Sequence, residues 1–187
     1  MTSILIFAGS VRRGAFSKQL AAAATTAITE WGAKPTLIDL VDYDAPIYNG
    51  DLEDAVGIPE TVVEFRRLVA SHHGLVISTP EYNGFITPLL LNLFCWASRP
   101  SPGDDFGTVF QGKPVALMAS SPGRLGGVRA IPRLRDAVAE LGMVPVPGFV
   151  TLPQAGTGFT DDGRLAEPTG ADGLNALMKR LIAASQH

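Results

Sequence analysis

Residues 3–31, SILIFAGSVRRGAFSKQLAAAATTAITEW, contain a complete unit of strand, loop and helix. The run from Ser3 to Ala8 is apolar and rich in β-branched and aromatic residues, which is typical of a strand buried on both faces. From Ser17 to Trp31 the sequence is rich in alanine and repeats apolar residues at helical spacing, with Ser17 as a suitable N-cap. Such a unit is the building block of parallel α/β sheets.

The same alternation continues along the chain. We expect further strands over 35–40, 74–79, 114–119 and 143–150, further helices over 60–71, 87–97, 131–141 and 172–185, and polar loops over 41–54 and 153–169. Prolines 145 and 147 place the last strand at an edge of the sheet. Five parallel strands with right-handed crossovers fit a flavodoxin-like fold, a three-layer α/β sandwich with strand order 2-1-3-4-5. No linker or repeat divides residues 1–187, so we expect a single domain.

Composition excludes several classes of protein. Of the 187 residues 46% are hydrophobic and 18% are charged, and the formal net charge is −3. These values argue against disorder and against nucleic acid or an anionic membrane surface as a partner. One cysteine and three histidines leave too few ligands for a structural zinc site. A lone cysteine and the lack of any apolar stretch near the roughly 20 residues of a membrane span favour a cytoplasmic protein.

Ligands of open parallel sheets bind at the carboxyl ends of the strands, beside the point where the strand order reverses. Three loops reach that edge: AGSVRRGAFS (8–17), TPEYNGFITP (79–88) and SSPGRLGGVR (120–129). We therefore expect the functional site to be built from these three loops.

The first loop carries the residue types of a phosphate site. Ser10 and Arg12 follow the predicted strand, and Ser17 stands at the start of the predicted helix. Helix N-termini present unpaired N–H groups and the positive end of the helix dipole, which favour a bound phosphate. Because the loop lacks the dinucleotide pattern GxGxxG, a single phosphomonoester fits it better than a pyrophosphate. The alternative is a tight turn with two solvated arginines, Arg12 and Arg13.

The other two loops suit a flat ring system. In PEYN (80–83), an acid, an aromatic ring and an amide follow a buried strand, so that Tyr82 can pack beside a heteroaromatic ligand. In the third loop, Ser120 and Ser121 precede glycines 123, 126 and 127, which allow the backbone to approach a ligand closely. The alternatives are an ordinary structural turn and a flexible Gly/Ser loop.

Three other signals are weaker. The segment GTVFQGKP (107–114) matches most of a nucleoside-triphosphate loop, but Pro114 stands where that loop requires Ser or Thr. His72 and His73 follow a predicted helix, which favours a capping role over catalysis. Cys95 lies within an apolar helical run and is interpreted as a small core or interface residue. We expect no catalytic side chain and no metal site.

With its motifs in this order, the chain resembles the NADPH-dependent FMN reductase family of flavodoxin-like proteins, which includes quinone, chromate and azo-dye reductases. The resemblance rests on GSVRRGAFS (9–17), PEYN (80–83) and NLFCWASR (92–99), and it extends from about residue 4 to at least residue 141. It implies an FMN-binding enzyme. Ala15 and Ser17 stand where the family usually has serine and asparagine, so we expect FMN to bind more weakly than is usual and to exchange as a substrate.

The resemblance also assigns roles to residues. It implies that Ser10, Arg12 and Ser17 hold the FMN phosphate. The residues that border the isoalloxazine ring would be Pro80, Glu81, Tyr82 and Asn83, and those near its pyrimidine end Ser120, Ser121 and Gly123. NADPH or NADH would be the electron donor in a ping-pong cycle, with Arg124 or Arg129 as a candidate contact to its phosphate. The acceptor would be a small molecule: a quinone, a metal oxyanion, an azo compound or free flavin.

Two other functions are compatible with the same motifs. A flavodoxin-type electron carrier would bind FMN without reacting with a nicotinamide, although such carriers are usually strongly acidic and this chain is not. A ligand-binding relative without flavin would keep the fold only.

A subunit contact is indicated by the apolar run LLLNLFCW (89–96) and by the Pro-rich loop beside it over 99–112. Within this run, Leu91 and Cys95 replace polar residues common in the family. We therefore expect a homodimer or homotetramer. The alternative is that this run is a single core helix.

Overall fold

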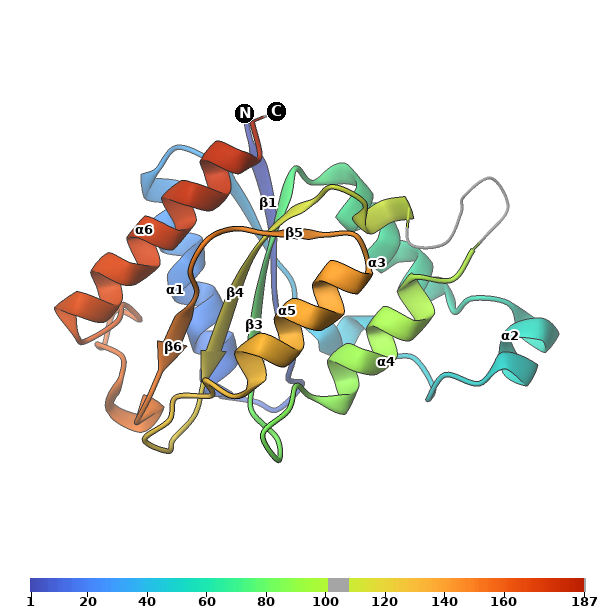
Figure 1. The fold of residues 1–187 in the computed structure, drawn as a ribbon, viewed down its shortest axis with the longest axis horizontal. Coiled ribbons are helices and arrows are strands. Elements are labelled where there is room, and N and C mark those ends of the chain that lie inside the picture. Colours follow the sequence, from blue (N-terminus) through green and yellow to red (C-terminus); the bar gives the residue numbers. More distant parts are fainter. Residues whose placement is uncertain (101–107, 187) are drawn as a thin grey trace.

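The computed structural model describes residues 1–100 and 108–186. Its sheet is parallel, with the order β2-β1-β3-β4-β5, and a sixth strand, β6, also pairs with β4 (Figure 1). The strands are β1 (Ser3–Ala8), β2 (Lys34–Leu37), β3 (Gly74–Pro80), β4 (Pro114–Ser120), β5 (Val144–Pro145) and β6 (Val150–Leu152). The predicted flavodoxin-like sheet with order 2-1-3-4-5 is therefore confirmed.

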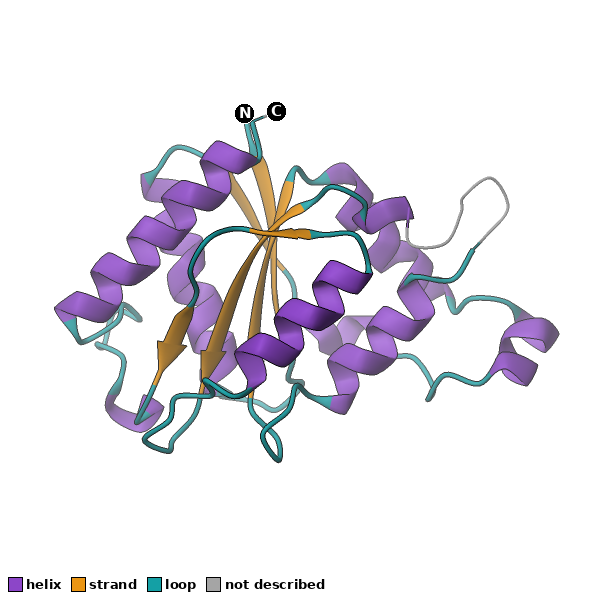
Figure 2. Cartoon of the chain, in the orientation of Figure 1, coloured by secondary structure: helices purple, strands orange, loops and turns teal. Residues whose placement is uncertain are grey.

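Helices cover both faces of this sheet. They are α1 (Phe16–Glu30), α2 (Gly50–Val56), α3 (Glu60–Ser71), α4 (Pro88–Ala97), α5 (Ala130–Glu140) and α6 (Pro168–Ala184). Helices α1 and α6 lie on one face, while α3, α4 and α5 lie on the other (Figures 1 and 2). No helix in the part of the chain that the structure describes is both long and apolar enough to cross a membrane.

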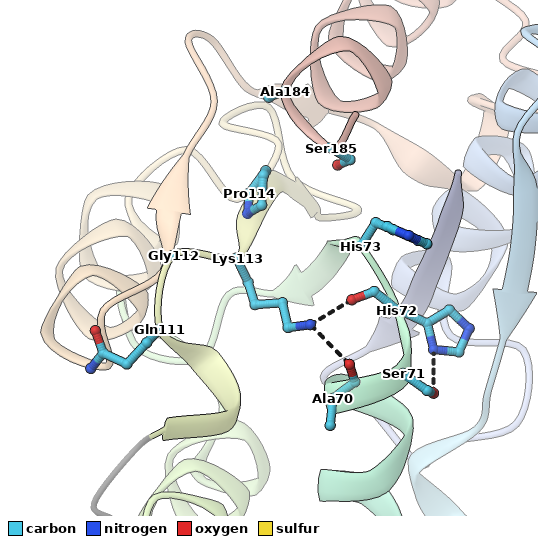
Figure 3. A pocket seen from close by; sticks show the side chains of 10 residues that line it. All are labelled: Ala70, Ser71, His72, His73, Gln111, Gly112, Lys113, Pro114, Ala184 and Ser185. Atoms are coloured by element: carbon cyan, nitrogen blue, oxygen red, sulfur yellow. Dashed lines mark hydrogen bonds between the residues drawn. The ribbon is translucent and has the colours of Figure 1, made fainter. Parts of the chain in front are cut away.

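The C-terminal end of α3 is capped by side chains at the amino-terminal edge of the sheet. The Nδ1 atom of His72 lies 2.7 Å from the carbonyl oxygen of Leu68, which confirms the predicted capping role for His72. For His73 the prediction is wrong, because its Nδ1 accepts from the Ser3 N–H of β1, at 3.1 Å. The ammonium of Lys113 donates to the carbonyl oxygens of Ala70, at 3.1 Å, and His72, at 2.6 Å (Figure 3). A positive charge at the carbonyl end of a helix is favourable.

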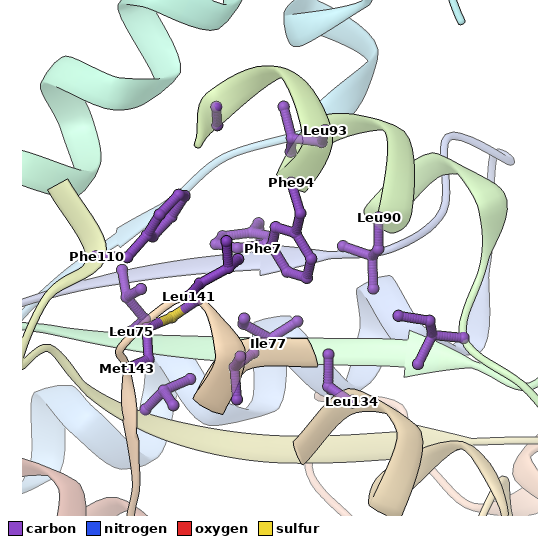
Figure 4. Close-up of a cluster of buried hydrophobic side chains, with 14 of the residues drawn as sticks. Phe7, Leu75, Ile77, Leu90, Leu93, Phe94, Phe110, Leu134, Leu141 and Met143 are labelled. Atoms are coloured by element: carbon purple, nitrogen blue, oxygen red, sulfur yellow. The ribbon is translucent and has the colours of Figure 1, made fainter. Parts of the chain in front are cut away.

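The core consists of two apolar layers, one on each side of the sheet. Successive side chains of a strand point to opposite faces. Leu75 and Ile77 of β3 therefore pack with Leu90 of α4 on one face (Figure 4), while Val76 faces α1 and α6 on the other. This burial on both faces explains why the strands are continuous apolar runs.

Helix α1 begins one residue earlier than predicted. Its N-cap is Ala15, whose carbonyl oxygen accepts hydrogen bonds from the backbone N–H groups of Lys18 and Gln19. Gly14, at φ +65, reverses the chain directly before it. The prediction that Ser17 is the N-cap is therefore wrong, because Ser17 lies inside the first turn and is buried.

The edge strands are shorter than predicted. The strand expected over 143–150 is broken into β5 and β6, because Pro147 has no N–H to donate and Gly148 adopts φ +87. At the opposite edge β2 ends at Leu37, because the Asp39 carboxylate accepts a hydrogen bond from the Val41 N–H, at 3.1 Å, and starts a 3-10 turn.

A helix also replaces part of a predicted loop. Helix α2 begins within the segment expected as a polar loop over 41–54 and ends at Val56, two residues beyond it. Asn49 caps its N-terminus by accepting from the Asp51 N–H, at 2.9 Å, and Gly57, at φ +77, ends it. The last helix, α6, begins at Pro168 instead of Asp172, since proline suits the first position of a helix.

Helix α4 is only partly a core helix. Leu90, Leu93 and Trp96 are buried, but Cys95 is exposed and Leu91 is 38% exposed. In the isolated chain Cys95 is therefore a surface residue, and the core interpretation is wrong. Half of the loop expected over 99–112, residues 101–107, lies outside the described residues, and so does the first residue of the segment 107–114.

Candidate functional site

One cavity of about 320 Å³ lies at the carboxyl ends of β1, β3 and β4. Its lining comes from all three of the loops that the sequence singled out. The predicted site residues that line it are Ser10, Arg12, Ser17, Pro80, Glu81, Tyr82, Ser120 and Ser121. Asn83 and Gly123 lie in the same loops but do not line the cavity, whereas Phe16 and Pro122 do and were not predicted.

The first loop directs the N-terminus of α1 into this cavity. Ser10 is buried and its hydroxyl accepts a hydrogen bond from the Arg12 N–H, at 3.3 Å, which folds the loop over the end of β1. Ala15, Phe16 and Ser17 then line the cavity with the first turn of the helix. The free N–H groups and positive dipole of this turn attract an anion.

Two hydroxyl groups of the cavity lining have no partner. Ser17 and Ser120 are each 1% exposed, and within the described residues their Oγ atoms make no hydrogen bond. A buried polar group left unsatisfied costs about 1–3 kcal/mol, so such groups generally serve a ligand or an ordered water. Ser17 lies on the first turn of α1 and Ser120 at the end of β4. Ser17, beside Arg12 in the lining, suits a phosphate ester, and Ser120 suits a polar edge of a ring system.

The second loop forms a two-residue β-hairpin. The backbone N–H and carbonyl groups of Tyr82 and Phe85 exchange hydrogen bonds of 3.0 and 2.9 Å. Between them Asn83 adopts φ +54 and Gly84 φ +75, the signature of a type I′ turn. The Asn-Gly pair thus has a structural reason: its turn holds the exposed Tyr82 at the cavity.

Glu81 joins the second loop to the third. Its carboxylate accepts hydrogen bonds from the Arg129 backbone N–H, at 3.0 Å, and Nε, at 2.7 Å, and also contacts Nη2. Arg129 is the N-cap residue of α5, so the carboxylate also lies at the positive end of that helix. Arg129 is thereby engaged by Glu81.

The third loop packs against protein backbone more closely than expected. A Cβ on Gly126 would lie 2.7 Å from the Pro153 nitrogen, and one on Gly127 would lie 2.9 Å from the Cβ of Ala119. The expectation that these two glycines approach a ligand is therefore wrong. The Gly123 carbonyl accepts from the Gln154 N–H, at 3.1 Å, which ties the loop to the segment after β6.

The segment 92–99 anchors residues 46–53 to α4, a contact that the sequence did not reveal. Asn92 and Trp96 lie four residues apart on one side of α4, and both donate to the Pro46 carbonyl oxygen, at 2.9 and 2.8 Å. Arg99 pairs with Glu53 at 2.9 Å. Desolvation raises the pKa of Glu53, but hydrogen bonds from Arg99 and Tyr48 outweigh it and lower the pKa overall. These contacts hold residues 46–53 against α4.

A second cavity, of about 300 Å³, lies at the opposite edge of the sheet (Figure 3). Its most buried charged group is Lys113, whose pKa is lowered by burial and whose ammonium already caps α3. The side chains of Gln111 and His73 point away from Lys113 (Figure 3). Because these groups do not converge, we assign no ligand to this cavity.

The sheet order defines a flavodoxin-like fold, with a cavity at the carboxyl ends of β1, β3 and β4. Residues 2–157 match the model of the NADPH-dependent FMN reductase family. An NAD(P)H-dependent FMN reductase of Pseudomonas aeruginosa is 34% identical over 98% of this chain and 92% of its own. A 2-hydroxy-1,4-benzoquinone reductase of a Burkholderia species is 37% identical over 75% of this chain and 72% of its own.

Solved structures agree on the fold. The NAD(P)H:(acceptor) oxidoreductase FerB of Paracoccus denitrificans superposes with a TM-score of 0.81 at 23% identity, over 100% of this chain and 98% of that one. The chain belongs to the NADPH-dependent FMN reductase family. It is therefore an NAD(P)H-dependent flavin oxidoreductase with FMN as cofactor.

Proposed function

We propose that the cavity at the carboxyl edge of the sheet is the FMN site. The phosphate lies on the first turn of α1, between Ser10, Arg12 and Ser17. The ring system lies across the second and third loops, against the residues Pro80, Glu81, Tyr82, Asn83, Ser120, Ser121 and Gly123. The observation that carries the proposal is the pair of buried, unpartnered hydroxyls of Ser17 and Ser120, which line the same cavity as Arg12.

The protein's part in the reaction is binding and orientation. The chemistry that bound FMN supplies is two-electron transfer: a hydride leaves NAD(P)H, and two electrons go on with two protons to a quinone, giving the quinol. Arg12 and the α1 N-terminus balance the phosphate charge, while Tyr82 packs at the rim beside the ring. Because Arg129 is engaged by Glu81, Arg124 is the proposed contact to the phosphates of the dinucleotide.

The proposed acceptor is a small aromatic or quinonoid molecule. Apolar side chains from the three loops are exposed around the candidate site: Val11, Tyr82, Phe85, Leu125 and Val128. Such a rim favours a flat apolar acceptor over a hydrated oxyanion. Relatives named quinone reductases support the same class, among them one of Pseudomonas putida that is 30% identical over 89% of this chain.

The proposal includes a homodimer or homotetramer in the cytoplasm. Leu91 and Cys95 on α4 and Ile47 before α2 are exposed, the last at 86%, and apolar surface of this kind is a common feature of subunit contacts. Sedimentation velocity at micromolar concentration should give a dimer or tetramer mass. A monomer mass would contradict this part of the proposal.

The test of function uses purified protein loaded with FMN under anaerobic conditions. Addition of NADPH or NADH should bleach the flavin absorbance, and a later addition of benzoquinone should restore it. A flavin that binds but is bleached by neither nucleotide would indicate an electron carrier instead. Protein that binds no FMN would contradict the whole proposal.

Replacing Ala15 by serine should tighten FMN binding. Ala15 is the N-cap of α1, is 4% exposed and makes no side-chain capping bond. A serine hydroxyl there can cap the helix in the free protein, worth about 0.5–2 kcal/mol, or donate to the phosphate in the complex. Ala15→Ser should therefore raise the unfolding free energy and lower the Kd of FMN. The same titration on Ala15→Gly is the control, and an unchanged Kd for Ala15→Ser would place the phosphate elsewhere.

A further inference from the structure

The ion pair between Glu81 and Arg129 is unusual in its setting. The Glu81 side chain is only 6% exposed, whereas that of Arg129 is 61% exposed. Glu81 lines the proposed FMN cavity, and its carboxylate receives the Arg129 backbone N–H and two guanidinium nitrogens. A carboxylate buried to this degree needs such compensation, because an unpaired buried charge is strongly unfavourable.

Arg129 is itself held in a fixed place. Gly127 lies tightly beneath Ala119 and Ser120 at the end of β4, and the Ala130 N–H donates to the Gly127 carbonyl at 3.0 Å. Arg129 therefore starts α5 from a rigid base. Its Nε also lies 3.9 Å from the position that a Cβ on Gly84 would take, beside the hairpin turn. The pair thus connects the hairpin of the second loop to the rigid end of β4.

The pair has an electrostatic consequence as well. Reduction of a flavin adds negative charge to its ring, so a nearby uncompensated carboxylate opposes reduction and a nearby uncompensated cation favours it. Glu81 lies in the ring loop and Arg129 cancels its charge with two guanidinium contacts.

We propose that Glu81 and Arg129 form a positioning pair that holds the hairpin at the ring edge and sets the reduction potential of the bound flavin by cancelling the Glu81 charge. Neither residue needs to touch the reacting atoms. The inference rests on the proposed FMN site, and it assigns to this pair a function beyond lining the cavity.

The test compares three variants: Arg129→Met, Glu81→Gln and the double variant with both changes. With saturating FMN, the midpoint potential should fall in Arg129→Met, rise in Glu81→Gln and return close to the wild-type value in the double variant. Opposite shifts are the signature of charge, because a merely structural disturbance would move both single variants in the same direction. The Kd of FMN should rise about tenfold in Arg129→Met, since the hairpin loses the two guanidinium contacts to Glu81 Oε1 that hold it at the ring edge.

A second readout needs no flavin. In the free protein, amide hydrogen exchange of residues 82–85 should become faster in Arg129→Met. Arg129→Lys keeps the positive charge, so this variant, once saturated with FMN, should retain the wild-type reduction potential of the flavin. The matched control is Arg67→Met, which removes an arginine from the exposed pair with Glu60 on α3, at 3.2 Å; neither of these residues lines the cavity. It should change neither potential nor exchange.

The results separate this inference from the proposed function. If the wild-type protein binds no FMN, the FMN site is wrong, and the exchange experiment still tests the pair. If FMN binds but the two single variants shift the potential in the same direction or leave it unchanged, the FMN site stands and the charge-balancing pair is overturned. Unchanged exchange in Arg129→Met would overturn the positioning function.

Discussion

Replacing Arg12 by alanine should weaken FMN binding by one to two orders of magnitude. The Arg12 side chain lines the cavity beside the first turn of α1, where the phosphate is proposed to lie. A hydrogen bond to a charged group contributes about 1.5–3 kcal/mol, which corresponds to a factor of about 10 to 100 in Kd. Isothermal titration with FMN at low salt measures the change directly.

The neighbouring residue provides a matched control. Arg13 is exposed, carries the same charge and does not line the cavity. Arg13→Ala should change the Kd by less than about threefold, since exposed charges are screened by salt and solvent. Equal effects of the two substitutions would mean that the loop attracts the anion only through its overall charge, and the assigned contact would be wrong.

Replacing Trp96 by alanine should cost about 3–5 kcal/mol of unfolding free energy. Trp96 is fully buried, packs edge to face on Tyr48 with 5.0 Å between ring centroids, and donates from Nε1 to the Pro46 carbonyl. Since domains of this size are stable by only about 5–15 kcal/mol, the variant should be close to unfolding at 37 °C. Urea denaturation followed by circular dichroism provides the measurement.

Trp96→Phe separates packing from the hydrogen bond. It keeps an aromatic ring in the core but removes one of the two donors to the Pro46 carbonyl, since Asn92 still donates to it. The expected loss is therefore about 1–3 kcal/mol, from the lost hydrogen bond and the lost volume. Amide exchange over residues 46–53 should increase in this variant while the sheet stays protected. A Trp96→Ala variant as stable as the wild type would contradict the described contact between α4 and this segment.

The sheet could be predicted because its strands are buried on both faces. The runs over 3–8, 74–79 and 114–119 are apolar except at their ends, at Ser3, Ser78 and Thr79, and this pattern alone indicates a parallel sheet with helices on each side. Helix α2 could not be predicted in this way, since no residue in it is buried and it therefore lacks an apolar stripe. The only sequence features that indicate this helix are the capping residues at its two ends, Asn49 and Gly57.

The candidate site was predictable to the level of loops. Strand order brings the loops after β1, β3 and β4 to one edge, and all of the predicted site residues except Asn83 and Gly123 line one cavity. The partners of those residues were not predictable. Glu81 meets Arg129 across 48 positions and Glu53 meets Arg99 across 46, and local patterns do not show which loops meet at atomic distance. The burial of Ser17 likewise depended on a helix start shifted by one residue.

Competition between FMN and riboflavin tests the central claim most directly, because the two ligands differ only in the phosphate. If the first turn of α1 with Ser10, Arg12 and Ser17 holds that phosphate, the wild-type protein should bind FMN at least about 100-fold more tightly than riboflavin, and Arg12→Ala should lose most of this preference. Equal affinity of the wild-type protein for the two ligands would contradict the account.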